Sequence, residues 1–327
     1  MSAQSSRGDG TLAAPHVAGD PVPPPGYRLV DQHRLLGSVV SAVWESADGA
    51  VLTWASRRHR KRRTEPGRRA FGCAPRRLAW WIAVAFTAGS VCFVAGAAGA
   101  VAGPTQWWPN AAYFAGSLLF TAGAAAQLVE TWRTGRDVAA PGAPPRSATL
   151  RAAAHSGRQA RRLWVFIPGR LDWNASLIQI VGTVLFNINC FYGMYTRLSM
   201  AQEDVRVWVP STVASVCFVV SSQLAFCEAT GRFFAWRPRS LDWWITTGSL
   251  AGSWGFLLSS IAGFFLGGDL GALVTGVLGP HGETLWLEYI VDGALLAGSL
   301  CFLVGTGLMI PEALGAHGGR GAGAREA

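Results

Sequence analysis

Charged residues are scarce in this 327-residue chain: they make up 14% of it, whereas a typical soluble domain carries about 25%. Half of the residues are hydrophobic, and the mean hydropathy is positive. Lysine occurs once, at Lys61, so nearly all of the 28 basic residues are arginine. The composition therefore favours a membrane protein over a soluble domain, and its richness in Arg, Gly and Ala is typical of a GC-rich bacterial genome.

Motifs that build catalytic, metal or haem sites are also missing. The six cysteines contain no CxxC pair, all six histidines lie outside the apolar runs, and no P-loop, HExxH or GxSxG motif is present. The first 77 residues show no apolar core followed by a cleavage site, so no signal peptide is predicted. We therefore expect no enzymatic activity, metal or cofactor, and we expect the first apolar run to stay in the membrane.

Six apolar runs reach the length of about 20 residues that a helix needs to cross a bilayer. They are approximately Ala79–Ala102, Asn110–Val129, Trp173–Met194, Val207–Phe226, Trp243–Leu266 and Leu285–Ile310. The predicted fold is thus an all-α membrane protein with six transmembrane helices.

The connections between these runs alternate in charge. Two of the connections and both terminal regions hold nearly all of the basic residues, and the other three connections hold only Arg197 and Arg206. Because basic loops stay in the cytoplasm, both termini are predicted to be cytoplasmic in a multi-pass protein of the cell membrane. The basic face would then contact anionic lipid head groups of the bilayer, and we expect no nucleic-acid partner.

An internal repeat is visible in the same runs. Every odd-numbered run opens with P-x-x-L-x-W, and a hydroxyl residue followed three positions later by Phe recurs in all six runs, after Gly or Ala. The opening motifs are Pro75-Leu78-Trp80, Pro168-Leu171-Trp173 and Pro238-Leu241-Trp243. The hydroxyl–Phe pairs are Ser90–Phe93, Ser117–Phe120, Thr183–Phe186, Ser215–Phe218, Ser253–Phe256 and Ser299–Phe302. The predicted architecture is therefore three copies of one helical hairpin.

The repeated residues are interpreted as packing and anchoring positions. Small residues beside the hydroxyls let neighbouring helices approach closely, and the Trp side chains fit an aromatic belt at head-group level. Thirteen positions after the second Ser of each hairpin stands an acid: Glu130, Glu228 and Glu312. We expect these to form surface pairs with Arg133, Arg232 or Arg320, which contribute about 0 to 1 kcal/mol each.

The chain then divides at the repeats. The segments are a basic, largely disordered cytoplasmic region (1–69), hairpin 1 (75–131), an Arg-rich linker (132–167), hairpin 2 (168–229), hairpin 3 (238–312) and a Gly-rich tail (313–327). Within the first of these, apolar residues over Arg28–Trp54 recur at near-helical spacing, which predicts a short amphipathic helix lying on the membrane.

The paired G-S-x-x-F motifs, such as Gly116–Phe120 and Gly298–Phe302, resemble the YrhK-like family of small bacterial membrane domains. In that family two helices with this pattern form one hairpin unit, so the resemblance would cover about Pro75 to Glu312 as three tandem units. The second unit departs from the pattern at Thr183 and Ala214. The family implies no activity and no catalytic residues.

A few polar residues inside the spans are the remaining candidates for a site, because polar groups in a membrane are often functional. They are Asp292, Asn187, Asn189, Gln179 and Gln223. Two functions stay open. One is a non-enzymatic scaffold or signalling component whose cytoplasmic arm binds lipid or a membrane or cytoplasmic protein partner, and the other is a small-solute transporter or channel that uses these residues.

Overall fold

The computed structural model describes residues 20, 21, 23, 26–61, 74, 75, 77–102, 108–138, 169–195, 197–267 and 283–314. It is mostly helical, and six of its helices are long and apolar enough to cross a membrane, as the sequence predicts. The long helices are α2 (Leu78–Ala102), α3 (Trp108–Val138), α5 (Leu171–Tyr192), α7 (Val209–Thr230), α8 (Leu241–Gly267) and α10 (Glu283–Gly307). Before α7 come α6 (Met200–Glu203) and the π-helical turn η1 (Asp204–Trp208), and after α10 comes α11 (Met309–Leu314).

The P-x-x-L-x-W motif marks where three of the long helices begin. Its Leu is the first residue of α2, α5 and α8. The Trp two positions later does not form the lipid-facing belt that the sequence predicts, since Trp173 and Trp243 are buried in the protein. The exposed rings belong instead to the next residue along the chain, Trp81 and Trp244. Helical geometry explains the difference, because one residue turns the side chain about 100° around the axis.

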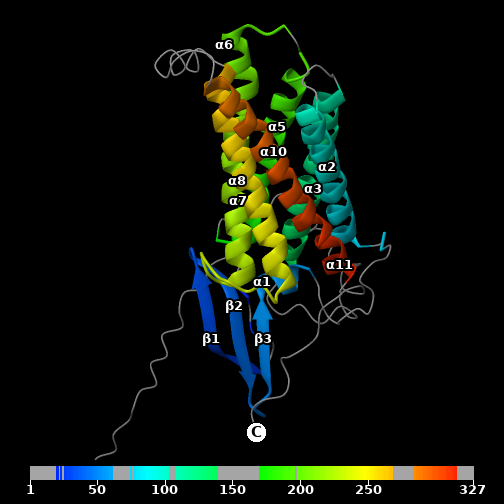
Figure 1. The fold of residues 1–327 in the computed structure, drawn as a ribbon. Coiled ribbons are helices and arrows are strands. Elements are labelled where there is room, and N and C mark those ends of the chain that lie inside the picture. The colour runs from blue at the N-terminus through cyan, green and yellow to red at the C-terminus, as the bar shows by residue number, and fades with distance from the viewer. Residues whose placement is uncertain are drawn as a thin grey trace, which may run out of the picture.

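The six long helices form a closed ring. Helix α2 packs against α3 and α10, α5 packs against α3 and α7, and α8 packs against α7 and α10. Figure 1 shows them side by side along one direction, with α11 at the end nearest the strands and α6 at the opposite end. We call these the sheet end and the far end of the bundle.

Glycines allow the closest helix contacts in this ring, as the packing interpretation predicts. A Cβ atom added to Gly252 of α8 would lie 2.6 Å from a ring carbon of Phe302 and 2.8 Å from the carbonyl oxygen of Gly298, both on α10. A Cβ on Gly89 of α2 would lie 2.7 Å from Phe120 of α3. Small residues therefore permit backbone approach that any side chain would prevent.

Phenylalanine fills the centre of the ring at mid-height. All six Phe side chains of the hydroxyl–Phe pairs are buried. Three of them, from alternate helices of the ring, contact one another: the ring centroids of Phe93, Phe186 and Phe256 are 5.6, 5.7 and 5.7 Å apart. These three rings, which we call the Phe triangle, close the axis of the bundle between its two ends.

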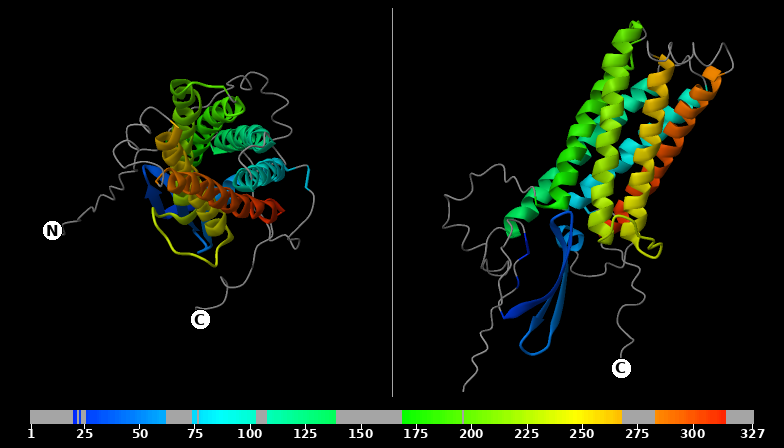
Figure 2. Two further views of the ribbon diagram at one scale, coloured as in Figure 1. Left: turned by 45° about the horizontal axis from the view of Figure 1, so that its top comes forward. Right: turned by 90° about the vertical axis from the view of Figure 1, so that its left-hand side faces the viewer.

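A three-stranded antiparallel sheet of order β1-β2-β3 lies at the sheet end (Figures 1 and 2). Its strands are β1 (Tyr27–Leu35), β2 (Ser38–Ser46) and β3 (Val51–Ala55), and the short helix α1 (Ser56–Arg60) follows β3 directly. The helix predicted over Arg28–Trp54 is therefore wrong, and the fold is mostly helical but not all-α as predicted. The disorder expected for residues 1–69 does not extend to residues 26–61. Residues 1–19 and 62–69 lie outside the described residues.

Turn chemistry explains why this segment forms strands. Leu36 and Gly37 both adopt positive φ (49° and 80°), the conformation of the two-residue turn that joins antiparallel strands, and Gly49 (φ 83°) lies in the second turn. Along β2, Val40, Ala42 and Trp44 are buried, whereas Val43 and Glu45 are less so, which is the two-residue period of a strand.

The sheet packs directly onto the bundle. Val40 is buried against Leu171 and Cys227, at the start of α5 and the end of α7. The Ser38 hydroxyl donates a hydrogen bond to the Gly169 carbonyl (2.5 Å), and His33 Nε2 lies 2.6 Å from the Gly231 carbonyl. These contacts fix the position of α1 under the helix ends.

Candidate functional site

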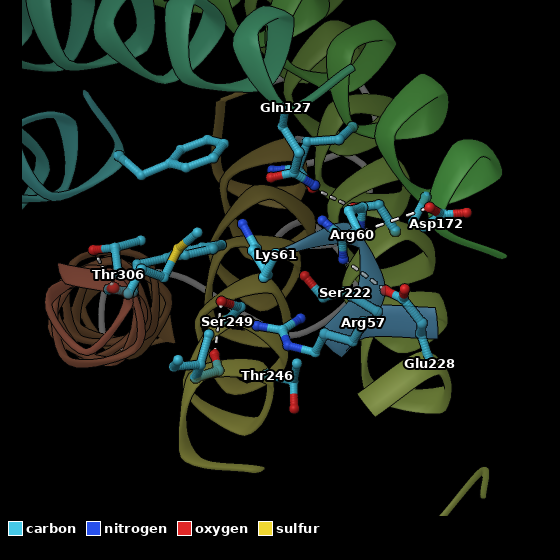
Figure 3. A pocket seen from close by; sticks show the side chains of 18 of the residues that line it. Arg57, Arg60, Lys61, Gln127, Asp172, Ser222, Glu228, Thr246, Ser249 and Thr306 are labelled. Atoms are coloured by element: carbon cyan, nitrogen blue, oxygen red, sulfur yellow. Dashed lines mark hydrogen bonds and ion pairs between the residues drawn. The ribbon is translucent and has the colours of Figure 1, made fainter. Parts of the chain in front are cut away.

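A buried network of ion pairs occupies the sheet end of the bundle (Figure 3). Its cations lie on α1 and just after it, and its carboxylates come from five helices, α3, α5, α7, α8 and α11. We call this set the ion-pair cluster: Arg57, Arg60, Lys61, Glu130, Asp172, Glu228, Asp242 and Glu312. Helix α1 is thus held from several sides of the ring at once.

Arg60 has the most partners in the cluster. Its Nη2 donates to Glu228 (2.7 Å), its Nη1 to Glu130 (3.3 Å), and its Nε lies 3.6 Å from Asp172. These carboxylates belong to α7, α3 and α5, so a single side chain links three helices. The Arg60 side chain is only 5% exposed.

Arg57 extends the network to α8 and α11, and Lys61 adds a second cation beside Glu130. Arg57 Nη2 donates to Glu312 of α11 (3.0 Å), and its Nε lies 3.4 Å from Asp242 of α8. Lys61 Nζ donates to Glu130 (3.1 Å). Asp172 also accepts hydrogen bonds from Arg170 and from the backbone N–H of Trp173. This acid therefore lies in the first turn of α5, where negative charge is favoured, and also belongs to the cluster.

Burial and attraction oppose each other in this cluster, and attraction prevails. Burial disfavours the charged form of Arg60, but the charges of Glu228, Glu130 and Asp172 more than compensate, so the pKa of Arg60 is raised above its ordinary value. The pKa of Arg57 is raised in the same way, against burial, by Glu312 and Asp242. Both guanidiniums therefore remain charged, and removing either would leave buried carboxylates without compensation.

The glutamates at the ends of the repeats were predicted to form weak surface pairs, and this prediction is wrong. Glu130, Glu228 and Glu312 are all buried, and they bind cations from α1, far away in the sequence. The relevant signal was present in the Arg-rich run, where Arg57, Arg60 and Lys61 share one face of a helix at spacings of three and four.

A small polar void separates the cluster from the apolar layer above it. It has a volume of about 70 Å³, enough for a few water molecules, and is lined by Phe86, Phe120 and Phe302 on one side and the α1 cations on the other. Figure 3 shows the hydroxyl and amide side chains around it, including Gln127, Ser222, Thr246, Ser249 and Thr306. No group of three or more His, Cys, Asp or Glu side chains that could hold a metal ion occurs among the described residues.

A larger cavity of about 490 Å³ opens at the far end. The Phe triangle lies at its floor, since Phe186 and Phe256 line it, and its wall carries the carboxylates Asp292 and Glu203. The cavity is also lined by Asn110, Trp208 and Asp292, which stand seven positions before Ser117, Ser215 and Ser299. We call it the far-end cavity.

The five polar residues predicted as a candidate site do not form one constellation. Asp292 and Asn189 both line the far-end cavity, whereas Gln179 lines the void at the sheet end and accepts a hydrogen bond from Ser221 (2.6 Å). Asn187 of α5 donates to Thr121 of α3 (2.9 Å), and Gln223 donates to the Phe233 carbonyl (2.9 Å). The last two residues therefore have structural hydrogen bonds.

The sequence and the fold were compared with protein families, curated proteins and solved structures. None of the three comparisons finds a match. The resemblance to the YrhK-like family therefore stays a prediction.

Proposed function

We propose that this chain is a non-enzymatic scaffold or signalling component of the bacterial cell membrane, in which the six-helix bundle holds the N-terminal sheet rigidly at the cytoplasmic face. The observation that carries the proposal is the ion-pair cluster. Arg57 and Arg60 follow β3 with no linker and are buried among carboxylates of five helices. A sheet that is joined to the helix ends by this cluster moves whenever the helix ends are displaced.

The orientation belongs to the same proposal. Arg57, Arg60, Lys61 and Arg170 lie at the sheet end, and basic residues favour the cytoplasmic side. The sheet end would then be cytoplasmic and the far end would face the outside.

The three hairpins are proposed to be repeats of one unit with approximate threefold symmetry. Equivalent residues of the repeat converge at three levels along the axis, which supports this arrangement. Glu130, Glu228 and Glu312 meet α1 at the sheet end. The Phe triangle occupies the middle, and Asn110, Trp208 and Asp292 line the far-end cavity. We further propose that each hairpin corresponds to one YrhK-like unit.

The sheet offers a surface for a protein partner. Val30 of β1 and Val51 of β3 are 56% and 65% exposed, and Leu29 and Leu52 nearby are 48% and 41% exposed. Both strands are edges of the sheet, where unpaired backbone groups add hydrogen-bonding capacity. An apolar edge held against the membrane bundle suits a partner that adds a strand.

A site-specific photo-crosslinker tests the scaffold role in native membranes. With the crosslinking residue at Val30 or Val51, we expect one discrete protein adduct, and we expect Arg57→Gln/Arg60→Gln to reduce its yield because the sheet is no longer held in place. The matched control carries the crosslinker at Val220, an exposed position in the middle of α7, where only lipid is expected. No adduct at either strand position, or equal yield from the double variant, would contradict the proposal.

A transporter or channel is the second candidate, and the far-end cavity favours it. The cavity ends on the Phe triangle, and the ion-pair cluster closes the other end, as expected for a pathway open to one side only. Flux into proteoliposomes separates the two functions. A scaffold predicts no solute flux from the native chain or from Arg57→Gln/Arg60→Gln, whereas a gated pathway predicts flux that rises when the cluster is weakened.

A further inference from the structure

The wall of the far-end cavity combines acids with aromatic rings. Asp292 of α10 and Glu203 of α6 supply carboxylates, and Tyr113, Tyr192 and Trp208 supply aromatic rings. No Lys, Arg or His is among the described residues that line it. A site with two anions and several π faces favours a cation, and a ring face attracts an ammonium group most strongly when water is excluded.

The aromatic wall already attracts one cation of the protein itself. The guanidinium of Arg206, an exposed residue of η1, lies 5.2 Å from the centre of the Tyr192 ring. This contact shows that the Tyr192 ring binds a cationic group on one of its faces.

Two polar atoms on the lining residues have no partner for a hydrogen bond. The Tyr113 hydroxyl and the Trp208 Nε1–H are both buried and unsatisfied. A buried polar atom normally has a hydrogen-bond partner, which a bound group can supply here. Because the indole N–H only donates, the missing partner of Trp208 must be a hydrogen-bond acceptor.

We propose that the far-end cavity binds a small organic ammonium ion that also carries a hydrogen-bond acceptor. The carboxylates of Asp292 and Glu203 face the charge, the aromatic rings surround the alkyl groups on nitrogen, and Trp208 donates to the acceptor. The volume of about 490 Å³ is within the 300–1,000 Å³ typical of small-molecule sites. This site does not depend on the scaffold role of the sheet end.

The same chemistry occurs in a free solute and in the ammonium head group of a membrane lipid. Isothermal titration of the full chain in nanodiscs distinguishes the two sources, with choline as the probe. In discs of phosphatidylglycerol, which has no ammonium group, free choline should bind. In discs of phosphatidylcholine the same affinity indicates a soluble ligand, and a lower apparent affinity indicates that the lipid head group competes for the cavity.

Three comparisons test the recognition itself. The neutral isostere 3,3-dimethylbutan-1-ol should bind much more weakly than choline, because it lacks the charge. Asp292→Asn and Glu203→Gln should each weaken choline binding about tenfold or more, as expected for loss of a charged partner. Asp48→Asn, an exposed acid in the turn between β2 and β3, is the matched control and should bind as the native chain does.

Thermal unfolding in the same discs shows whether each variant is folded. If Asp292→Asn fails to fold, the binding affinity of Glu203→Gln tests the role of the carboxylates. The proposal is overturned if the folded native chain does not bind choline in phosphatidylglycerol discs. It is also overturned if the neutral isostere binds as tightly, or if every folded carboxylate variant keeps native affinity.

Discussion

Replacing Arg60 by Gln is expected to release α1 from the bundle. The substitution removes a positive partner from Glu228, Glu130 and Asp172 and keeps an uncharged polar side chain of smaller size. Glu130 keeps Lys61 and Asp172 keeps Arg170, so Glu228 is the acid left without an ion pair. Breaking a buried pair by deleting one partner destabilises a protein by about 3 to 5 kcal/mol, because the remaining charge stays buried. Since about 1.4 kcal/mol corresponds to a factor of ten, the ratio of undocked to docked α1 should rise about 10²- to 10⁴-fold.

Hydrogen–deuterium exchange of the full chain in nanodiscs measures this ratio. The amide of Lys61 bonds to the Arg57 carbonyl (3.0 Å), so a peptide spanning α1 reports docking through its protection. We expect its exchange to accelerate by the same factor in Arg60→Gln, with peptides from the middle of α2 unchanged. The sheet peptides should lose protection less, because β1–β3 keep their own backbone pairing.

The matched control is Arg28→Gln, in the same sheet. Arg28 also pairs with a glutamate, Glu45 (2.9 Å), but its side chain is 80% exposed, so its pair contributes about 0 to 1 kcal/mol. Exchange of the α1 peptide should therefore match the native rate within a few fold. If Arg60→Gln behaves like Arg28→Gln, the ion-pair cluster does not hold α1, and the argument for a rigidly coupled sheet fails.

Three further predictions concern helix packing and the docking of the sheet. Phe256→Ala removes one ring of the Phe triangle and should lower stability by about 3 to 5 kcal/mol in reversible unfolding in mixed micelles, whereas Leu258→Ala on the exposed side of α8 should have a much smaller effect. Gly252→Ala should lower the Tm because its Cβ would meet Phe302, while Gly293→Ala, with open space around it, should keep or raise the Tm. Ser38→Ala should weaken sheet docking by about 1 kcal/mol, seen as faster exchange at the β1–β2 turn, and unchanged exchange there would contradict the hydrogen bond to Gly169.

The six spans were predictable because their signal is local. Lipid leaves no alternative to a helix of about 20 apolar residues, so each predicted run overlaps a helix of the structure. The packing role of the hydroxyl–Phe pairs was predictable for a similar reason. Gly252 stands one position before Ser253, Phe302 stands three positions after Ser299, and helical periodicity places such residues at the interface.

The strands and the ion-pair cluster were not predicted, because both depend on contacts distant in sequence. Val39, Val40, Val43 and Trp44 fit a helical period as well as a strand, and only the positive φ of Leu36 and Gly37 in the folded chain places a turn before them. The partners of Glu228 could not be read from its neighbours, since Arg60 lies 168 residues earlier. Asp292 and Asn189 stand out in the sequence as polar residues within apolar runs, but only the folded ring places them in one cavity.

The distance along the chain between Arg57 and Glu312 also sets an order of assembly. These two residues are 255 positions apart, and α1 is synthesised long before α11. Helix α1 therefore reaches its full set of carboxylates only after α11 has been synthesised. The partners of Arg60 lie on α3, α5 and α7, so Arg60 can pair before the chain is complete. Arg57 lacks its partners until α8 and α11 have formed. Complete docking of α1 therefore depends on α11, the last helix that the structure describes.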